Sequence, residues 1–476
     1  MKKSTILLLF TLTTAGFANA EDVTTSGNGV TYTLESLSTT ENSGVTKNGK
    51  VNSITIAEGD RFEIESGATM KMGDGVQLRI EGTANFAATD RVLVTRADEN
   101  AAPKGIYMVC DASDTEFKNI DFEYAGLRNF SNTGLTVANC TFRYNNGKMT
   151  TTGALAIGSD GATFNVDNCT FEYNEVPAIG GSAMAANGIE ITNCKFIDNN
   201  TKNTNKPQVN LTVGGANSVS IENCEFTGAQ RTNVGAVAVA NMSGIAGDNI
   251  VWISGNTIRD HRYGITFYGG MNATVANNQI IDNKYASSAM AGGAGISIYD
   301  YGTKPNVTIT GNTIEGNLWG ITVLGGENVN IGKVDNPDAK DYNPGHNTFK
   351  NNGNGGALYD LYNNSALTIY AQGNHWSVDE QTAEKIESVI FHKPDDAKLG
   401  EVIYTPAWDG EGSVNEIASE AIRYADGKVY AEGADILVYT LGGALVARAN
   451  SVADLSALAS GVYVARANGK VLKCVK

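Results

Sequence analysis

Positive charge is scarce in this chain of 476 residues. Lysine and arginine together number 35, against 51 aspartate and glutamate residues, which leaves a formal net charge of −16 at pH 7. Nucleic acids and anionic membranes are bound through basic faces, so this balance argues against both as partners. The acidic surplus is compatible with calcium binding or with a role in solubility.

Long hydrophobic runs are also missing. The apolar run at residues 6–10 is too short to span a membrane, and no other run qualifies as a transmembrane segment. Because this run follows Lys2 and Lys3 and precedes Ala18-Asn19-Ala20, it predicts a signal peptide over residues 1–20 with cleavage before Glu21. The mature chain would then carry 33 basic against 51 acidic residues, a net charge of −18.

Complete metal and hydrolase motifs are absent as well. No Cys-x-x-Cys pair or histidine cluster accompanies the cysteines, so a metal site built from them is disfavoured. Polygalacturonase-like hydrolases share an ordered Asn-x-Asp, Asp-Asp, Gly-His-Gly and Arg-x-Lys series, which this chain lacks; its one Asp-Asp pair is Asp395-Asp396. Glycoside hydrolysis needs two carboxylates flanking one bond, and no pair of repeats presents them convincingly.

What the chain does contain is a repeat. Two alternating apolar positions are followed by Asn or Gly, then Cys or Asn, one spacer, and Phe or Ile, as in residues 135–142 and 309–314. The Cys/Asn position, which we call the column, recurs about every 28 residues. The column residues are Ile120, Cys140, Cys169, Cys194, Cys224, Asn256, Asn278, Asn312, Asn347 and Asn374. Period-two strands at this spacing predict a β-solenoid, because a single unit cannot bury its apolar face alone.

This pattern resembles the right-handed parallel β-helix superfamily, which includes pectate lyases and many bacterial surface proteins. The resemblance implies an all-β protein with a right-handed parallel β-helix over residues 53–376. Residues 21–52 would form an N-terminal segment or cap, and residues 377–412 a C-terminal cap and linker that covers the open end. The superfamily is functionally mixed, so the fold alone does not give the activity.

Four of the six cysteines share the column, at Cys140, Cys169, Cys194 and Cys224. Cysteines in an exported protein ordinarily suggest disulfides. Vertical neighbours in a stack point the same way, however, which is poor disulfide geometry. We therefore expect free, buried thiols that give way to an asparagine ladder in the later coils.

The last 65 or so residues break the period and form a separate module, predicted over residues 413–476. Three segments, at 436–443, 454–458 and 461–464, precede a closing strand at 469–473. Their order resembles the C-terminal sorting domain of the type IX secretion system, a small β-sandwich. The resemblance implies a Bacteroidota-type source, the type IX secretion machinery as partner, and a place outside the cell or on the outer-membrane surface. The alternative is a small β-sandwich that binds carbohydrate.

A second ladder lies five residues past the column. Its members are Asn145, Asn174, Asn199, Asn283, Asn317 and Asn352, where we expect asparagine to tolerate a left-handed backbone while its amides stack. Ala229 and His261 interrupt it. Elimination from a uronate needs a cation for the carboxylate, supplied by arginine or Ca²⁺, and a base for the ring proton. Around His261, the catalytic candidates are His261, Arg259, Asp260 and Arg262.

Aromatic and charged residues near this segment suit a sugar chain laid along the solenoid axis. The substrate-binding candidates are Tyr263, Tyr268, Asp282, Lys284, Tyr285, Tyr299, Asp300, Tyr359 and Asp360. The group of Tyr299, Asp300 and Tyr301 with Tyr359, Asp360 and Tyr362 could bind sugar or Ca²⁺. Both groups could equally be ordinary solvated turns and loop surface.

Three functional hypotheses therefore stand. The protein is a secreted or surface-attached binder of extracellular polysaccharide, a lyase acting on acidic glycans, or an adhesin that recognises host protein. Because aromatics are few, at 8% of the residues, and no catalytic signature is complete, binding without turnover is favoured. No cofactor is required by any motif, although the lyase hypothesis would accommodate Ca²⁺.

Overall fold

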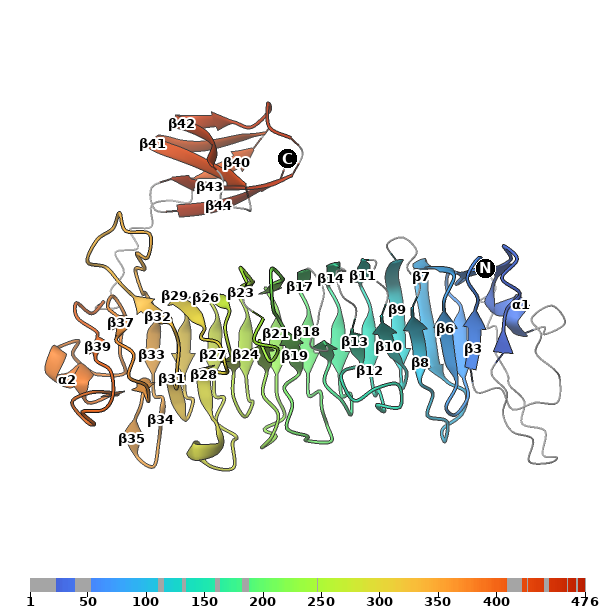
Figure 1. The fold of residues 1–476 in the computed structure, drawn as a ribbon, viewed down its shortest axis with the longest axis horizontal. Helices are drawn as coiled ribbons and strands as arrows, with labels where there is room; N and C mark the ends of the chain where they lie inside the picture. Colours follow the sequence, from blue (N-terminus) through green and yellow to red (C-terminus); the bar gives the residue numbers. More distant parts are fainter. Residues whose placement is uncertain are drawn as a thin grey trace. The chain divides into compact units, whose positions relative to one another are not determined.

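The computed structural model describes residues 23–38, 53–109, 115–130, 134–158, 163–181, 188–245, 247–408, 422–425, 427–440, 445–459, 461–467 and 470–475. The signal peptide predicted at residues 1–20 lies outside these ranges. The chain forms two compact units, residues 1–408 and 409–476. The first is a right-handed parallel β-helix whose strands stack one coil after another along its long axis (Figure 1).

Three parallel sheets make the walls of the helix. The first sheet has fourteen strands: β1 (Val23–Thr24), β3 (Ser53–Ile56), β6 (Gln77–Ile80), β8 (Gly105–Met108), β10 (Gly126–Asn129), β13 (Leu155–Ile157), β16 (Ile179–Gly181), β19 (Val209–Thr212), β22 (Val237–Ala240), β25 (Ile265–Tyr268), β28 (Ala294–Tyr299), β31 (Trp319–Val323), β36 (Leu361–Asn363) and β38 (Ile390–Phe391).

The second sheet contains β2 (Thr31–Tyr32), β4 (Arg61–Glu63), β7 (Thr83–Arg96), β9 (Thr115–Glu123), β11 (Leu135–Ala138), β14 (Thr163–Asp167), β17 (Gly188–Thr192), β20 (Ser218–Glu222), β23 (Ile250–Ser254), β26 (Asn272–Ala276), β29 (Asn306–Thr310), β32 (Asn328–Gly332), β37 (Ile369–Ala371) and β39 (Val402–Ile403). The third contains β5 (Thr69–Met72), the second halves of β7 and β9, and β12 (Thr141–Arg143), β15 (Thr170–Glu172), β18 (Lys195–Ile197), β21 (Glu225–Thr227), β24 (Thr257–Arg259), β27 (Gln279–Ile281), β30 (Thr313–Glu315) and β33 (Thr348–Lys350).

In-register pairing stacks like residues inside the helix. The Phe/Ile position of the repeat forms an internal stack of rings. Phe142, Phe171 and Phe196 lie with ring centroids 4.8 and 5.2 Å apart and with nearly parallel planes. These rings are fully buried. Offset aromatic stacking adds to the free energy gained by burying apolar area, so this phenylalanine stack contributes strongly to the stability of the β-helix.

The column predicted from the repeat is confirmed. The backbone N–H of Cys140 donates to the Sγ of Cys169, at 3.4 Å, and the same bond recurs from Cys169 to Cys194 and from Cys194 to Cys224. From Cys224 onward the acceptor is the side-chain oxygen of an asparagine, beginning with Asn256 at 2.9 Å. All four thiols are buried and free, as expected.

Two left-handed turns per coil explain the Asn and Gly positions of the repeat. The residue before the column has φ between 50° and 68° in ten coils, from Asn119 to Gly373. A second left-handed residue lies four positions past the column, for example Tyr144, Asp198 and Asp260. Our expectation of left-handed backbone at the asparagines five positions past the column was therefore wrong by one residue. Those asparagines instead form side-chain hydrogen bonds from coil to coil, as described below.

A short α-helix lies at each end of the β-helix. At the N-terminal end, β1 pairs with β3 and β2 with β4, so the described part of residues 21–52 already forms a coil, with α1 (Leu34–Ser38) packed on the core. At the C-terminal end, β38 and β39 extend the first two sheets, and α2 (Ala383–Glu387) buries Ile386 beside the core.

Residues 422–475 contain an antiparallel sheet with a separate hydrophobic core. Its strands are β40 (Arg423–Ala425), β41 (Lys428–Thr440), β42 (Leu445–Asp454), β43 (Val462–Ala467) and β44 (Lys470–Val475). A bulge between Ala431 and Asp435 bends the β41–β42 hairpin, and β40 contacts β44. This module therefore has the all-β construction expected of it.

Candidate functional site

The second ladder is a continuous chain of side-chain hydrogen bonds inside the helix. The side-chain nitrogen of each amide donates to the side-chain oxygen of the next, from Asn174 to Asn199 at 2.6 Å and from Asn317 to Asn352 at 3.0 Å. We call this chain the amide ladder; its members are Asn174, Asn199, Gln208, His261, Asn283, Asn317, Asn352 and Asp360. It fixes the turn between the third and first sheets.

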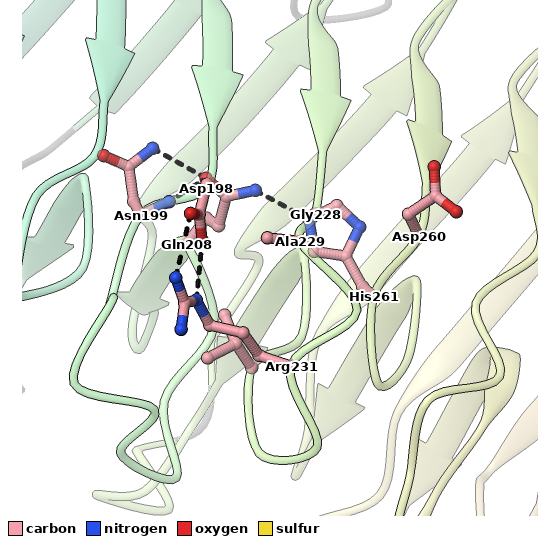
Figure 2. Close-up of a pocket in the computed structure, with 9 residues that line it drawn as sticks. Asp198, Asn199, Gln208, Gly228, Ala229, Arg231, Asp260 and His261 are labelled. Carbon is pink, nitrogen blue, oxygen red and sulfur yellow. Dashed lines mark hydrogen bonds and ion pairs between the residues drawn. The ribbon is translucent and has the colours of Figure 1, made fainter.

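The gap at Ala229 is filled from elsewhere in the chain. Gln208, just before β19, accepts the side-chain N–H of Asn199 at 2.6 Å and lies 2.6 Å from Nε2 of His261 (Figure 2). Because the Gln208 oxygen is already held by the backbone and side chain of Asn199, its nitrogen must be the donor. The Nε2 atom of His261 is then the acceptor, and Nδ1 donates to Asn283 at 3.3 Å.

His261 is consequently a neutral interior residue in this structure. Its side chain is 1% exposed, and burial lowers its pKa to about 3. Both ring nitrogens are engaged within the ladder. A catalytic role for His261 stays a prediction, and it would require a ligand to reach this enclosed position.

A shallow crevice with no room for a water molecule lies beside the ladder. Its lining includes His261, Gln208 and Ala229, together with Asp198 and Arg231 (Figure 2). Arg231 pairs with Asp198 through two bonds of 2.6 and 2.8 Å, so the charges here neutralise each other. The space is too small for a sugar and is best described as a packing defect next to Ala229.

The other candidates around His261 are not gathered on one side. Arg259 is exposed, and Asp260 occupies the left-handed turn. The guanidinium of Arg262 donates to the carbonyl of Ala291. Thus the structure separates the interior imidazole from the arginines that were to act with it.

Four further binding candidates lie near this segment. The ring of Tyr263 lies over Gly235 of the previous coil, and burial raises the pKa of its phenol. Asp282 and Lys284 form an ion pair of 2.6 Å. Tyr285 is half-buried, and its backbone N–H donates to the carbonyl of His261. These groups are mainly engaged with the protein itself.

The remaining tyrosines lie on the outer surface of the first sheet, near its C-terminal end. Tyr268 and Tyr299 are cross-strand neighbours on β25 and β28, and the ring of Tyr301 stacks on Tyr268 with centroids 4.8 Å apart. Tyr359 and Tyr362 surround Trp319, each with a centroid distance of 4.8 Å. Together with Phe391, which stacks on Tyr362 at 4.6 Å, we call these residues the aromatic face.

A polar strip separates the two aromatic clusters. Ser297 and Thr322 point outward between the interior side chains of β28 and β31, and Thr322 donates to Ser297 at 3.1 Å. They are only 5% and 9% exposed. Rings beside a narrow polar floor give a surface with apolar walls and hydroxyl groups between them, which is a common composition of ligand sites.

The two aspartates predicted to bind substrate in this region, Asp300 and Asp360, differ in exposure and in hydrogen bonding. Asp300 is exposed beside Tyr299. Asp360 is fully buried and ends the amide ladder, where it accepts from Asn352 at 3.1 Å and from the backbone and hydroxyl of Ser377. Burial raises the pKa of Asp360 to about 6. Within the described ranges, no three His, Cys, Asp or Glu side chains lie together as a metal site would need.

Sequence reasoning missed Trp319 and Phe391 on the aromatic face and Gln208 in the ladder. Trp319 could have been found, because it directly precedes Gly320, the glycine that comes before the alternating run of residues 321–324. Gln208 could not have been found in this way, because it does not stand five residues past a column residue. It occupies the place in the ladder that Ala229 leaves without an amide.

Residues 181–375 match the family model for the right handed beta helix region. Regions of this kind are common in polysaccharide-acting proteins and adhesins. A search of curated protein sequences gave no match. Among the helices in the described ranges, none is long and apolar enough to cross a membrane.

Proposed function

We propose that this protein is secreted or surface-attached and binds extracellular polysaccharide through the aromatic face. The observation that carries the proposal is the presence of two aromatic clusters on the outer side of the first sheet. One contains Trp319, Tyr359, Tyr362 and Phe391, and the other contains Tyr268, Tyr299 and Tyr301. Half-buried aromatic rings offer apolar surface at low entropic cost, and the tyrosine hydroxyls can hydrogen-bond to sugar hydroxyls, whereas the indole N–H of Trp319 already donates to the carbonyl of Ala289.

The arrangement suits a polymer because the face extends over successive coils. Its strands, β25, β28, β31, β36 and β38, are neighbours in the first sheet, with adjacent strands about 4.8 Å apart. A linear glycan lying along the axis would meet an aromatic ring repeatedly. The enclosed position of His261 offers no comparable contact, so binding without turnover remains the favoured function.

The test is affinity electrophoresis of the purified protein in gels that contain neutral or uronate polysaccharides. We expect retention by at least one polysaccharide, reduced in Trp319→Ala and Tyr362→Ala. Trp252→Ala is the matched control, because Trp252 is an exposed tryptophan on β23, in the second sheet. Thermal melting of each variant separates lost binding from lost folding.

Each alternative function has its own outcome in this experiment. An unsaturated uronate product would support the lyase hypothesis instead. Absence of retention on every polysaccharide would contradict the proposal and favour an adhesin that recognises protein. Equal losses in Trp252→Ala and Trp319→Ala would remove the aromatic face as the binding surface.

Export by the type IX secretion machinery is the second part of the proposal. The independent core of residues 422–475 supports a module that folds apart from the β-helix. The buried free thiols also suit a protein whose stability in an oxidising compartment does not depend on disulfides.

A further inference from the structure

Asp300 is a carboxylate without a protein partner at the edge of the aromatic face. No hydrogen bond or ion pair of its side chain occurs among the described residues, although it directly follows Tyr299 and precedes Tyr301. Its carboxylate lies over Gly325 of the next coil, where an added Cβ atom would come within 2.3 Å of the Asp300 Cγ. The glycine therefore leaves room for an acceptor group directly beside the tyrosines.

The charges next to Asp300 are mostly negative. Burial and the nearby Glu327 raise the pKa of Asp300, while Lys304 lowers it. At the other end, burial raises the pKa of Tyr362, with further contributions from Tyr359, Asp395 and Asp396. At the Asp300 end, two carboxylates, Asp300 and Glu327, thus stand against one lysine, Lys304.

We infer that the aromatic face takes a neutral, hydroxyl-rich glycan rather than a uronate polymer, and that Asp300 accepts hydrogen bonds from its hydroxyl groups. The inference rests on the proposed polysaccharide binding and names the class of sugar. Hydroxyl groups that donate to a carboxylate make charge-assisted bonds, while the rings cover the apolar side of the sugar.

A uronate would meet the opposite situation. Its repeating carboxylates would approach Asp300 and Glu327, where Lys304 is one cation against two carboxylates, and like charges at close range repel. The guanidinium of Arg262 already donates to Ala291 and Asn205. The electrostatic surroundings therefore disfavour the acidic glycans on which a lyase would act at this face.

The test compares the full-length wild type with Asp300→Asn on a neutral β-glucan and on polygalacturonate, at low and high salt. We expect retention by the neutral polymer, independent of salt because no ion pair is involved. Asp300→Asn should weaken that retention about tenfold, the loss of one hydrogen bond to a charged group. On polygalacturonate the same substitution removes a repulsion, so retention should not fall.

Asp338→Asn is the matched control, since Asp338 is an exposed carboxylate on the loop after β32. It should leave retention by the β-glucan unchanged. Salt-sensitive retention by polygalacturonate but not by the β-glucan would overturn the neutral class while leaving polysaccharide binding intact. Unchanged retention of Asp300→Asn on the β-glucan would remove Asp300 as the anchor. Retention by neither polymer would contradict this inference. Absence of retention on every neutral and uronate polysaccharide tested would also contradict the proposed function.

Discussion

Replacing His261 by asparagine should change how the stability of the β-helix depends on pH. In the folded protein the pKa of His261 is lowered to about 3, whereas an exposed histidine in the unfolded chain titrates near 6.5. Between these values the unfolded chain binds more protons than the folded protein. The contribution of His261 to stability is therefore present above pH 6.5 and is lost as the pH falls towards 3.

The size of this loss is set mainly by the unfolded state. At pH 5 an unfolded histidine is almost fully protonated, while any folded pKa below 4 leaves His261 neutral. Linkage then gives a loss of about 2 kcal/mol for the wild type between pH 7 and pH 5. His261→Asn lacks this titration, so the stability difference between the two proteins should shift by that amount in favour of the variant.

The assay is urea unfolding of both proteins at pH 7 and pH 5. At pH 7 the variant should be about 1 kcal/mol less stable, because asparagine is too short to meet both Asn283 and Gln208. Subtracting the variant from the wild type at each pH cancels every other titrating group, including Asp360. A histidine signal in NMR spectra, assigned by its absence in His261→Asn, should stay neutral at pH 5. Titration of that signal near pH 6.5 in the folded protein, or a constant stability difference, would refute the reasoning.

Three further predictions concern the rest of the chain. Cys140, Cys169, Cys194 and Cys224 should resist a thiol reagent in the native protein and react fully after denaturation without reductant, since each is 1% exposed; disulfides among them in mass spectrometry would contradict the stack. Truncation after Gly412 should leave a β-helix with an unchanged melting temperature that accumulates in the periplasm, and normal surface display of this truncation would disprove the sorting role. Because burial raises the pKa of Asp360 to about 6, its contribution is complete below pH 3.8 and is lost as the pH rises through 6; relative to Asp360→Asn, the wild type should lose about 1 kcal/mol between pH 5 and pH 7 in urea unfolding.

The coil architecture was readable from the sequence because each coil repeats two physical requirements at fixed spacing. The residue before the column must accept a left-handed backbone, which favours Asn and Gly, and the column residue must present a hydrogen-bond acceptor inward. Both requirements show in most copies: the residue before the column is Asn or Gly except at His346, and the column residue is Cys or Asn except at Ile120. The amide ladder was visible for the same reason, although its left-handed residue was placed one position too late.

The binding surface was less readable because it depends on positions that do not repeat. Trp319 begins β31 and Tyr359 lies just before β36, and the segments that lead into these two strands differ in length from coil to coil. His261 looked like a titratable group placed in a turn, since the residue that encloses it, Gln208, lies 53 positions earlier. Alignment on one column cannot detect a side chain that enters the ladder from another part of the coil.

The direction of the amide ladder also bears on how such a protein could change in length. From Asn283 to Asn352 each asparagine accepts from the preceding coil, and Asn283 and Asn317 donate to the following one, so an inserted copy of an asparagine-bearing coil would join the ladder at both of its ends. Asp360 differs, because an ionised carboxylate accepts but cannot donate. Growth by coil duplication is thus compatible with the stretch from Asn283 to Asn352, whereas Asp360 marks a terminus beyond which this ladder cannot be extended.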